Sequence, residues 1–428
     1  MNSFKDLGLL PSLVTSLNSL KIFKPTEIQV KTIPMIMSGQ SVAGVSETGS
    51  GKTLAYALPV LHLLKELENE GKPVSENSTP RALVLVPTRE LGEQVAKVFK
   101  SLTHETRLRI RPALGGMTFE HSRRNIAAPF EVLLATPGRL LQLIDKGLVD
   151  LTDIRMIIFD EVDQMMDQGF LPDSKTIVDV CPPDVQLILF SATVSPDVQK
   201  LLNELFQNAD IFRTEGSGKT VSSLITKNLF IKDGIRWPAF EKVIKQPRQG
   251  GTLIFANTRE QCDKIAKELS ENGFESALYR GEMDKSDRRA NYKKFRSGEI
   301  KLMVATDLAG RGLDLDHIDL VINYHLPQQK ENYLHRVGRT ARAGRQGTVI
   351  NLVTERDYPL LEKMGLAHEI PKHLLNPKNK TGKTKAPTAS KDRASQPKSR
   401  PATSPVKRDK ETQAGKNKPF KKSNRPKR

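Results

Sequence analysis

The sequence contains no apolar run that approaches the roughly 20 residues needed to cross a bilayer. Its N-terminus, MNSFKDLGLLPSL, is amphipathic and has no secretory signal pattern. Only two cysteines occur, Cys181 and Cys262, and no metal-ligand spacing surrounds either of them. These absences argue against a membrane protein, a disulfide-stabilised secreted protein and a cysteine-based metal site. We expect a cytoplasmic protein that does not contact membranes and carries two inert thiols.

The C-terminal stretch has almost no aliphatic residues but is rich in positive charge. Residues 377–428 contain 18 Lys and Arg against 3 Asp and Glu, and their one aromatic residue is Phe420. The preceding residues carry 49 basic and 46 acidic side chains, so the net charge of +18 is concentrated in this tail. Such a segment cannot bury enough apolar surface to offset the entropy of ordering, and we expect it to be disordered. Its charge is typical of an arm that binds nucleic acid, although a solubilising or targeting tail has the same composition.

The rest of the 428-residue chain is long enough for two domains. Short apolar runs recur in both halves, and each is followed at once by a polar or glycine-rich signature. Runs rich in Val, Ile and Leu are typical of strands buried on both faces, and helical patterns lie between them. The runs are SVAGVS, ALVLV, EVLLA, MIIF and LILF, then TLIFA, SALY, KLMVA, LVINY and TVINLV. This alternation predicts doubly wound α/β domains at residues 1–210 and 225–376, joined by a linker at residues 211–224.

Two almost identical stretches end in the Gly-Lys-Thr of a phosphate-binding loop: ETGSGKT at residues 47–53 and TEGSGKT at residues 214–220. A working loop needs a strand before it and a helix that starts at its Lys-Thr, because backbone N–H groups and the helix N-terminus hold the phosphates. Residues 47–53 have both neighbours, whereas VSSLITKNLFIK after residue 220 is β-branched and not helical. We therefore predict one phosphate loop, at residues 47–53, and a linker at the second stretch.

Within the phosphate loop, Lys52 would reach the β and γ phosphates of a nucleotide, and the Thr53 hydroxyl would bind Mg²⁺. Ser46 stands where the usual pattern begins with Gly, and a small residue is tolerable there. The remaining cofactor-binding residues of the loop are Glu47, Thr48, Gly49, Ser50 and Gly51.

Carboxylates follow another apolar run, in MIIFDEVD. Phosphoryl transfer needs a carboxylate that holds Mg²⁺, partly through water, and hydrolysis needs a group that orients the attacking water. Asp160 suits the first role and Glu161 suits the second. A solvated acidic loop is a poor alternative directly after four apolar residues.

The motifs resemble, in order and spacing, those of the DEAD-box RNA helicases of helicase superfamily 2. The resemblance covers roughly residues 4–358, and nine motifs in the family's order leave little room for coincidence. It implies two tandem RecA-like doubly wound parallel-sheet domains, with the disordered basic tail after them. The motifs are PTEIQ, SETGSGKT, PTRELGEQ, TPGRL, DEVD, SAT, LIFANT, ATDLAGRGLD and HRVGRTARAGR.

The resemblance implies that the two domains close over ATP. Gln29 would read the adenine edge, with Ile22 at a place where an aromatic residue is common. Gly312 and Asp314 would meet the ribose. The implied catalytic residues are Lys52, Asp160 and Glu161 with His335 near the attacking water and Arg339 and Arg342 as arginine fingers. The residues implied to couple the carboxylates to RNA binding are Asp163, Ser191 and Thr193. Val162 replaces the family's namesake Ala, and Ala341 replaces the commoner Gly.

The resemblance also implies an RNA site made mostly of backbone amides, hydroxyls and arginines, which hold phosphate and sugar. Binding should therefore be largely independent of sequence, and the preference for RNA would come from 2′-OH contacts. Closure around one strand would bend it and pry a short duplex apart locally. The implied contacts are Pro87, Thr88, Arg89, Gly115, Gly116, Thr136, Pro137, Gly138, Arg139, Arg280, Gly281, Arg288 and Thr306.

These features predict an ATP-dependent RNA helicase that unwinds short duplexes or remodels RNA–protein complexes. A related enzyme that acts on DNA is disfavoured by the PTEIQ, SAT and HRVGRTAR motifs. A non-catalytic RNA clamp is disfavoured by intact Lys52, Glu161 and Arg342. The tail at residues 377–428 either adds RNA affinity or docks ribonucleoprotein partners.

Overall fold

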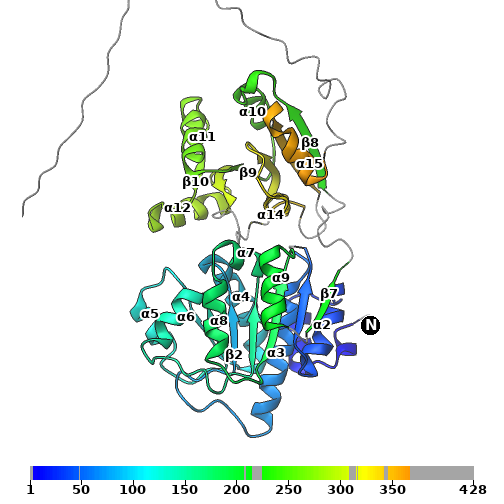
Figure 1. The fold of residues 1–428 in the computed structure, drawn as a ribbon, viewed down its shortest axis with the longest axis vertical. Coiled ribbons are helices and arrows are strands. Elements are labelled where there is room, and N and C mark those ends of the chain that lie inside the picture. Colours follow the sequence, from blue (N-terminus) through cyan, green and yellow to red (C-terminus); the bar gives the residue numbers. More distant parts are fainter. Residues whose placement is uncertain are drawn as a thin grey trace, which may run out of the picture. The chain divides into compact units, whose positions relative to one another are not determined.

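The computed structural model describes residues 3–47, 49–206, 209–214, 224–307, 315, 317–341 and 346–366. These residues all belong to one compact unit, Met1–Leu374. They form two separate parallel sheets, one in the first half of the unit and one in the second (Figure 1). The predicted fold class of two doubly wound domains is confirmed. The tail at residues 377–428 and most of the second Gly-Lys-Thr stretch lie outside the described residues.

The first sheet contains, within the described residues, seven parallel strands in the order β3-β4-β2-β5-β6-β1-β7. The five predicted runs are the five central strands. The two edge strands were not predicted: β3 contains Pro112, which only an edge tolerates, and β7 is largely exposed. The strands are β1 (Val42–Val45), β2 (Ala82–Leu85), β3 (Ile110–Ala113), β4 (Val132–Ala135), β5 (Met156–Phe159), β6 (Gln186–Ser191) and β7 (Asp210–Arg213).

Helices cover both faces of the first sheet (Figure 1). Because side chains alternate along a strand, Met156 and Ile158 of β5 join one hydrophobic core, and Ile157 and Phe159 join the other. Burial on both faces explains why this strand is a continuous apolar run. The helices are η1 (Lys5–Leu7), α1 (Pro11–Ser19), α2 (Glu27–Met37), α3 (Lys52–Asn69), α4 (Arg89–Thr106), α5 (Phe119–Asn125), α6 (Pro137–Ile144), α7 (Val162–Asp167), α8 (Leu171–Asp179) and α9 (Pro196–Leu205).

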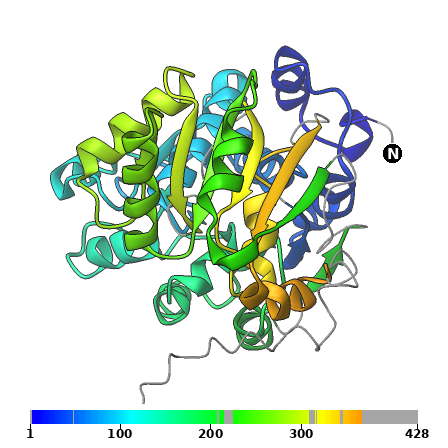
Figure 2. The same cartoon turned by 90° about the horizontal axis from the view of Figure 1, so that it is seen from above.

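The second sheet contains, in the described part of the chain, six parallel strands in the order β10-β11-β9-β12-β13-β8. Figure 2 shows β13 and β8 side by side at one edge. The five predicted runs of this half are strands, and β8 is added to them. The strands are β8 (Leu224–Phe230), β9 (Gly251–Ala256), β10 (Ala277–Tyr279), β11 (Leu302–Thr306), β12 (Ile318–Asn323) and β13 (Gly347–Val353).

This sheet also lies between two hydrophobic cores, because Ile254 of β9 packs on one face and Phe255 on the other. The described helices and turns of the second half are η2 (Lys232–Gly234), α10 (Trp237–Ile244), α11 (Arg259–Glu271), α12 (Lys285–Arg296), α14 (Lys330–Val337), η3 (Glu355–Asp357) and α15 (Tyr358–Met364).

The strand ends correct the predicted linker at residues 211–224. Residues 211–213 continue β7, which pairs with β1, and Leu224 already begins β8. An edge strand that is mostly exposed carries no apolar run, so its extent was missed. The division into domains otherwise stays a prediction.

Strand order brings distant signatures together at one edge of the first sheet. β5, β6 and β1 are neighbours, and they are parallel. Their carboxyl ends therefore present the loop after Val45, the carboxylates after Phe159 and the segment that starts at Ser191 side by side.

Candidate functional site

The phosphate loop between β1 and α3 depends on its glycines. Gly49 and Gly51 have φ of 88° and 89°, a region that other residues rarely adopt. A Cβ on Gly51 would also lie 2.4 Å from the Gln29 amide nitrogen. The helix α3 begins at Lys52, as predicted, so its unpaired N–H groups face the loop. Thr48 lies outside the described residues.

Gln29, the predicted adenine reader, is held against this loop. Its Nε2 donates to the Gly51 carbonyl at 3.0 Å, and its Oε1 accepts from the Thr26 backbone N–H at 2.9 Å. Ile22, predicted beside the adenine, is half-buried and packs against the hydrophobic core.

Lys52 is buried, and its Nζ donates to the carbonyls of Ser46 at 2.5 Å and Glu47 at 3.1 Å. Burial lowers the pKa of Lys52, whereas the charges of Asp163, Glu161 and Asp160 oppose this shift. The carboxylates that follow β5 therefore favour the charged form of Lys52 at the loop.

Asp160 follows β5 and is 2% exposed. Its Oδ2 accepts a 2.7 Å hydrogen bond from the hydroxyl of Tyr56, which lies one turn after Lys52 on α3. Burial raises the pKa of Asp160 to about 6, and the charge of Glu161 adds to the shift. Tyr56 was not predicted, although its spacing from Lys52 on a helix could have revealed it.

Glu161 occupies a strained backbone conformation at the N-terminus of α7. Its φ of 51° and ψ of 55° lie in the left-handed region, which is uncommon for residues other than glycine. The fully buried Val162 follows it in the hydrophobic core. Strain of this kind concentrates at functional sites, where the surrounding structure enforces it.

Asp163 is the centre of a buried network that joins the two halves. Its Oδ2 accepts from the backbone N–H and the hydroxyl of Thr193, both at 3.0 Å, and lies 3.3 Å from His335 Nε2 on α14. The Ser191 hydroxyl accepts from the Asp163 backbone N–H at 3.3 Å. Burial alone would raise the pKa of Asp163, but His335, Lys52 and Thr193 hold it well below its usual range.

The predicted arginine fingers are placed only in part. Arg339 is buried, and its Nε donates to the His335 carbonyl at 3.2 Å. Arg342 lies outside the described residues, as do Gly312 and Asp314 at the predicted ribose contact.

Arg336 was not predicted to have a role, yet it is the largest fully buried side chain described. It forms an ion pair with Asp307 and donates to Asn257 at 2.8 Å and Asn323 at 3.0 Å. It therefore joins α14 to the ends of β9, β11 and β12.

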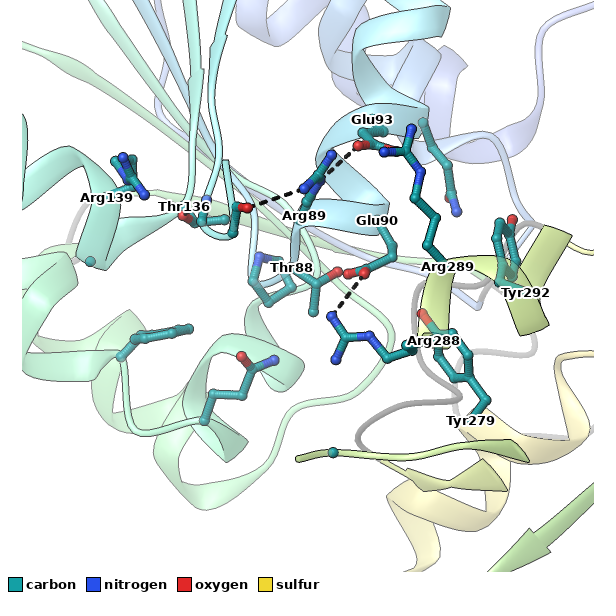
Figure 3. Close-up of a pocket in the computed structure, with 18 of the residues that line it drawn as sticks. Thr88, Arg89, Glu90, Glu93, Thr136, Arg139, Tyr279, Arg288, Arg289 and Tyr292 are labelled. Carbon is teal, nitrogen blue, oxygen red and sulfur yellow. Dashed lines mark hydrogen bonds and ion pairs between the residues drawn. The ribbon is translucent and has the colours of Figure 1, made fainter. Parts of the chain in front are cut away.

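A cleft of about 900 Å³ is lined by α4 and the loops of the first half and by α12 and β10 of the second half; we call it the α4–α12 cleft (Figure 3). All predicted RNA contacts line it except Pro137, Arg280 and Thr306. Pro137 and Thr306 are buried. The Thr136 hydroxyl accepts from the Gly115 N–H at 2.8 Å, which joins two of the predicted segments.

The arginines of this region interact with acceptors of the protein itself. Arg89 pairs with Glu93 at 2.8 Å, and Arg280 pairs with Asp263 at 2.7 Å. Arg139 donates to the Met117 carbonyl at 2.7 Å.

Arg288 lies 3.4 Å from Glu90, and this ion pair joins α12 to α4 (Figure 3). Glu90 was not predicted, because residues 198 positions apart show no local signal of their contact.

Ala341 has a φ of 55°, a left-handed conformation in which alanine is strained. We expect Ala341→Gly to raise the free energy of unfolding by about 0.5–1 kcal/mol, because relief of strain exceeds the added entropy of the unfolded chain. Chemical denaturation measures this difference. The control Ala290→Gly, in the interior of α12, should destabilise the protein by about 1 kcal/mol. Destabilisation by both substitutions would contradict the prediction.

The described residues contain no helix long and apolar enough to span a membrane. The cytoplasmic location stays a prediction. Both cysteines are free thiols, and burial raises the pKa of Cys181 to about 11 and that of Cys262 to about 12.

Comparison with known proteins identifies relatives along most of the chain. Residues 26–201 match the family model of the DEAD/DEAH box helicases, and residues 236–344 match the helicase conserved C-terminal domain. The DEAD-box ATP-dependent RNA helicase RhpA of Helicobacter pylori is 34% identical over 362 residues, 85% of this chain and 72% of the relative. The ATP-dependent RNA helicase RhlB of Aliivibrio salmonicida is 34% identical over 375 residues, 86% of this chain and 85% of the relative.

A solved structure agrees with this comparison. Saccharomyces cerevisiae Dbp5 bound to RNA and ADP BeF3 matches with a TM-score of 0.76 and 26% identity, over 87% of this chain and 95% of that chain.

Proposed function

The chain belongs to the DEAD-box ATP-dependent RNA helicases, and we propose that it binds the RNA backbone without sequence specificity and locally unwinds short duplexes or remodels RNA–protein complexes. ATP hydrolysis is the reaction coupled to this work. The observation that carries the proposal is the contact between His335 and Asp163. It connects the second half to the carboxylates beside the phosphate loop, while the α4–α12 cleft is lined by both halves.

We assign the phosphate loop and Gln29 to ATP binding. Lys52 and the N–H groups at the start of α3 would hold phosphates. Gln29 bonds to Gly51, so recognition of adenine and the shape of the loop are linked through one side chain. Arg339, with Arg342, would stabilise the charge that develops on the γ-phosphate.

The oxygen donors of the site fit Mg²⁺. Asp160 offers a carboxylate and Thr53 a hydroxyl, the ligand type that this ion prefers. When bound, Mg²⁺ would neutralise charge on the phosphates.

Glu161 would orient the attacking water. The hydrogen-bond network around Asp163 would couple RNA binding to the position of Glu161. Ser191 and Thr193 bond to Asp163, two residues after Glu161. A shift of His335 relative to Asp163 would therefore be transmitted to the Glu161 carboxylate through residues 161–163.

The α4–α12 cleft presents guanidinium groups, hydroxyls and backbone amides, which suit phosphate and sugar rather than base edges. This chemistry supports binding that is independent of sequence. The basic tail at residues 377–428 would add affinity through further phosphate contacts.

The proposal is tested by the rate of ATP hydrolysis of the protein alone, of the protein with single-stranded RNA, and of the protein with DNA of the same sequence. We expect stimulation by RNA only. Equal stimulation by DNA would contradict RNA selectivity. A protein that binds ATP but hydrolyses none in all three conditions would favour the non-catalytic RNA clamp. Deletion of residues 377–428 should lower RNA affinity and its salt dependence; an unchanged affinity would assign the tail to protein partners instead.

We expect Glu90→Gln to tighten RNA binding by about 3- to 10-fold, because Arg288 is freed from its carboxylate and a negative charge leaves the cleft. Equilibrium binding to single-stranded RNA measures the change. Glu120→Gln is a matched control: Glu120 is also the second residue of a helix capped by Thr, but it pairs with Arg123 outside the cleft. An equal gain in both variants would mean that net charge, not Arg288, sets the effect.

A further inference from the structure

Two helices present side chains to the α4–α12 cleft at the spacing of a single helical face. From α4 these are Glu90, Glu93, Gln94 and Lys97, and from α12 they are Arg289, Tyr292, Lys293 and Arg296. Positions i, i+3, i+4 and i+7 share one face, so the cleft is lined by two complete helix faces. In Figure 3 the Arg289 side chain extends from α12 towards the Glu93 end of α4.

The charges on these two faces differ along their length. Glu90 pairs with Arg288 of α12, whereas Glu93 pairs with Arg89 of its own helix. Lys97 lies about 10 Å along α4 from Glu90, two turns away. At one end of the cleft, the compensated end, the charges of Glu90 and Glu93 therefore neutralise those of the arginines. Both helices continue beyond this end.

Beyond this compensated end, no acidic residue of the described part of the chain pairs with three of the lining cations. Lys97, Lys293 and Arg296 are exposed, and within the described ranges none of them forms an ion pair. Lys294, which does not line the cleft, pairs with Glu299 at 3.6 Å. Cations from both halves thus line one cleft without compensation, an arrangement that suits a polyanion.

Aromatic rings accompany these cations. Tyr292 lies on the same face of α12, and its ring centroid is 6.1 Å from that of Tyr279. The Arg288 guanidinium in turn lies 5.8 Å from the Tyr279 ring. A lining of cations and tyrosines fits a single-stranded nucleic acid, whose phosphates meet the cations and whose bases stack on rings.

We propose that Lys97, Lys293 and Arg296 form a second phosphate-binding surface, which holds an RNA segment that flanks the strand bound at Arg89, Arg139 and Arg288. The proposal rests on the proposed function and extends the length of RNA that the protein grips.

The test compares two single-stranded RNAs, of about 6 and about 20 nucleotides, with the full-length protein. The variant Lys293→Gln/Arg296→Gln should bind the long RNA about 10-fold more weakly, and the slope of log affinity against log salt should fall by about 1 per cation removed. Binding of the short RNA should change less than about 2-fold. Lys97→Gln, from the other half, should show a smaller loss of the same kind.

Lys294→Gln is the matched control, because it removes a neighbouring exposed cation that does not line the cleft. The proposal is overturned if Lys294→Gln weakens the long RNA equally, or if the double variant weakens both RNAs by the same factor. Wild-type protein that binds neither RNA would overturn the proposed function as well. The substituted side chains are exposed, and unchanged unfolding midpoints would verify that the variants fold.

Discussion

Glu161→Gln is expected to lower RNA-stimulated ATP hydrolysis by about 100- to 1,000-fold, because an amide cannot accept a proton from water as a carboxylate can. Glu161 is held at the end of β5 by a left-handed backbone conformation and by buried neighbours on both sides, Asp160 and Val162. Gln has the same shape, so the conformation of the loop should persist. Phosphate release at saturating RNA measures the rate.

ATP and RNA affinity should remain within about 3-fold of wild type in this variant, since Lys52 and the α4–α12 cleft are untouched. Glu120→Gln, which removes an exposed carboxylate from α5, should leave hydrolysis unchanged. Hydrolysis by Glu161→Gln at the wild-type rate would assign the water-orienting role to another group. Loss of ATP binding would mean that Glu161 contributes to the binding of ATP rather than to the hydrolysis step alone.

The central strands could be predicted because burial on both faces demands continuous apolar runs. Met156–Phe159 and Gly251–Ala256 are of this kind, and each of their residues is buried. Edge strands have no such constraint, and β3, β7 and β8 were therefore missed. Pro112 in β3 even argues against a strand, unless the residue faces an open edge.

The phosphate loop was predictable because its parts are local. A strand, two glycines and a helix that begins at Lys52 follow one another within the chain, and their geometry follows from their order. The partners of this loop are not local. Tyr56 meets Asp160 across 104 positions, and Glu90 meets Arg288 across 198. Only the packing of the sheet and the meeting of the two halves create these pairs.

The second prediction with a large effect concerns the stability of the metal-free protein. Replacement of Asp160 and of Asp163, which both follow β5, by Asn should change the free energy of unfolding in opposite directions. Burial and the charge of Glu161 raise the pKa of Asp160 from 3.8 to about 6, so its ionised form is disfavoured in the folded state. Both states are protonated at about pH 3, and the penalty grows as the pH rises from about 3 to about 6. Above that range it amounts to about 3 kcal/mol.

Asp160→Asn is therefore expected to raise the free energy of unfolding by about 3 kcal/mol at pH 7.5, but by only about 0.5 kcal/mol at pH 4. The Asn side chain retains an oxygen that can accept from Tyr56. Denaturant unfolding in the presence of a chelator, across this pH range, measures the difference.

Asp163→Asn provides the contrast from the same segment. The pKa of Asp163 is lowered, because His335, Lys52 and Thr193 together outweigh the effect of burial, so its ionised form stabilises the folded state above the unfolded pKa of 3.8. This substitution replaces a buried acceptor of N–H and O–H groups by an amide and should destabilise the protein at pH 7.5 by about 3 kcal/mol or more. The difference should shrink as the pH falls below about 4. Stabilisation by both variants would show that burial alone governs these carboxylates and that the contact between His335 and Asp163 does not stabilise the folded state. Destabilisation by both variants would contradict the raised pKa of Asp160.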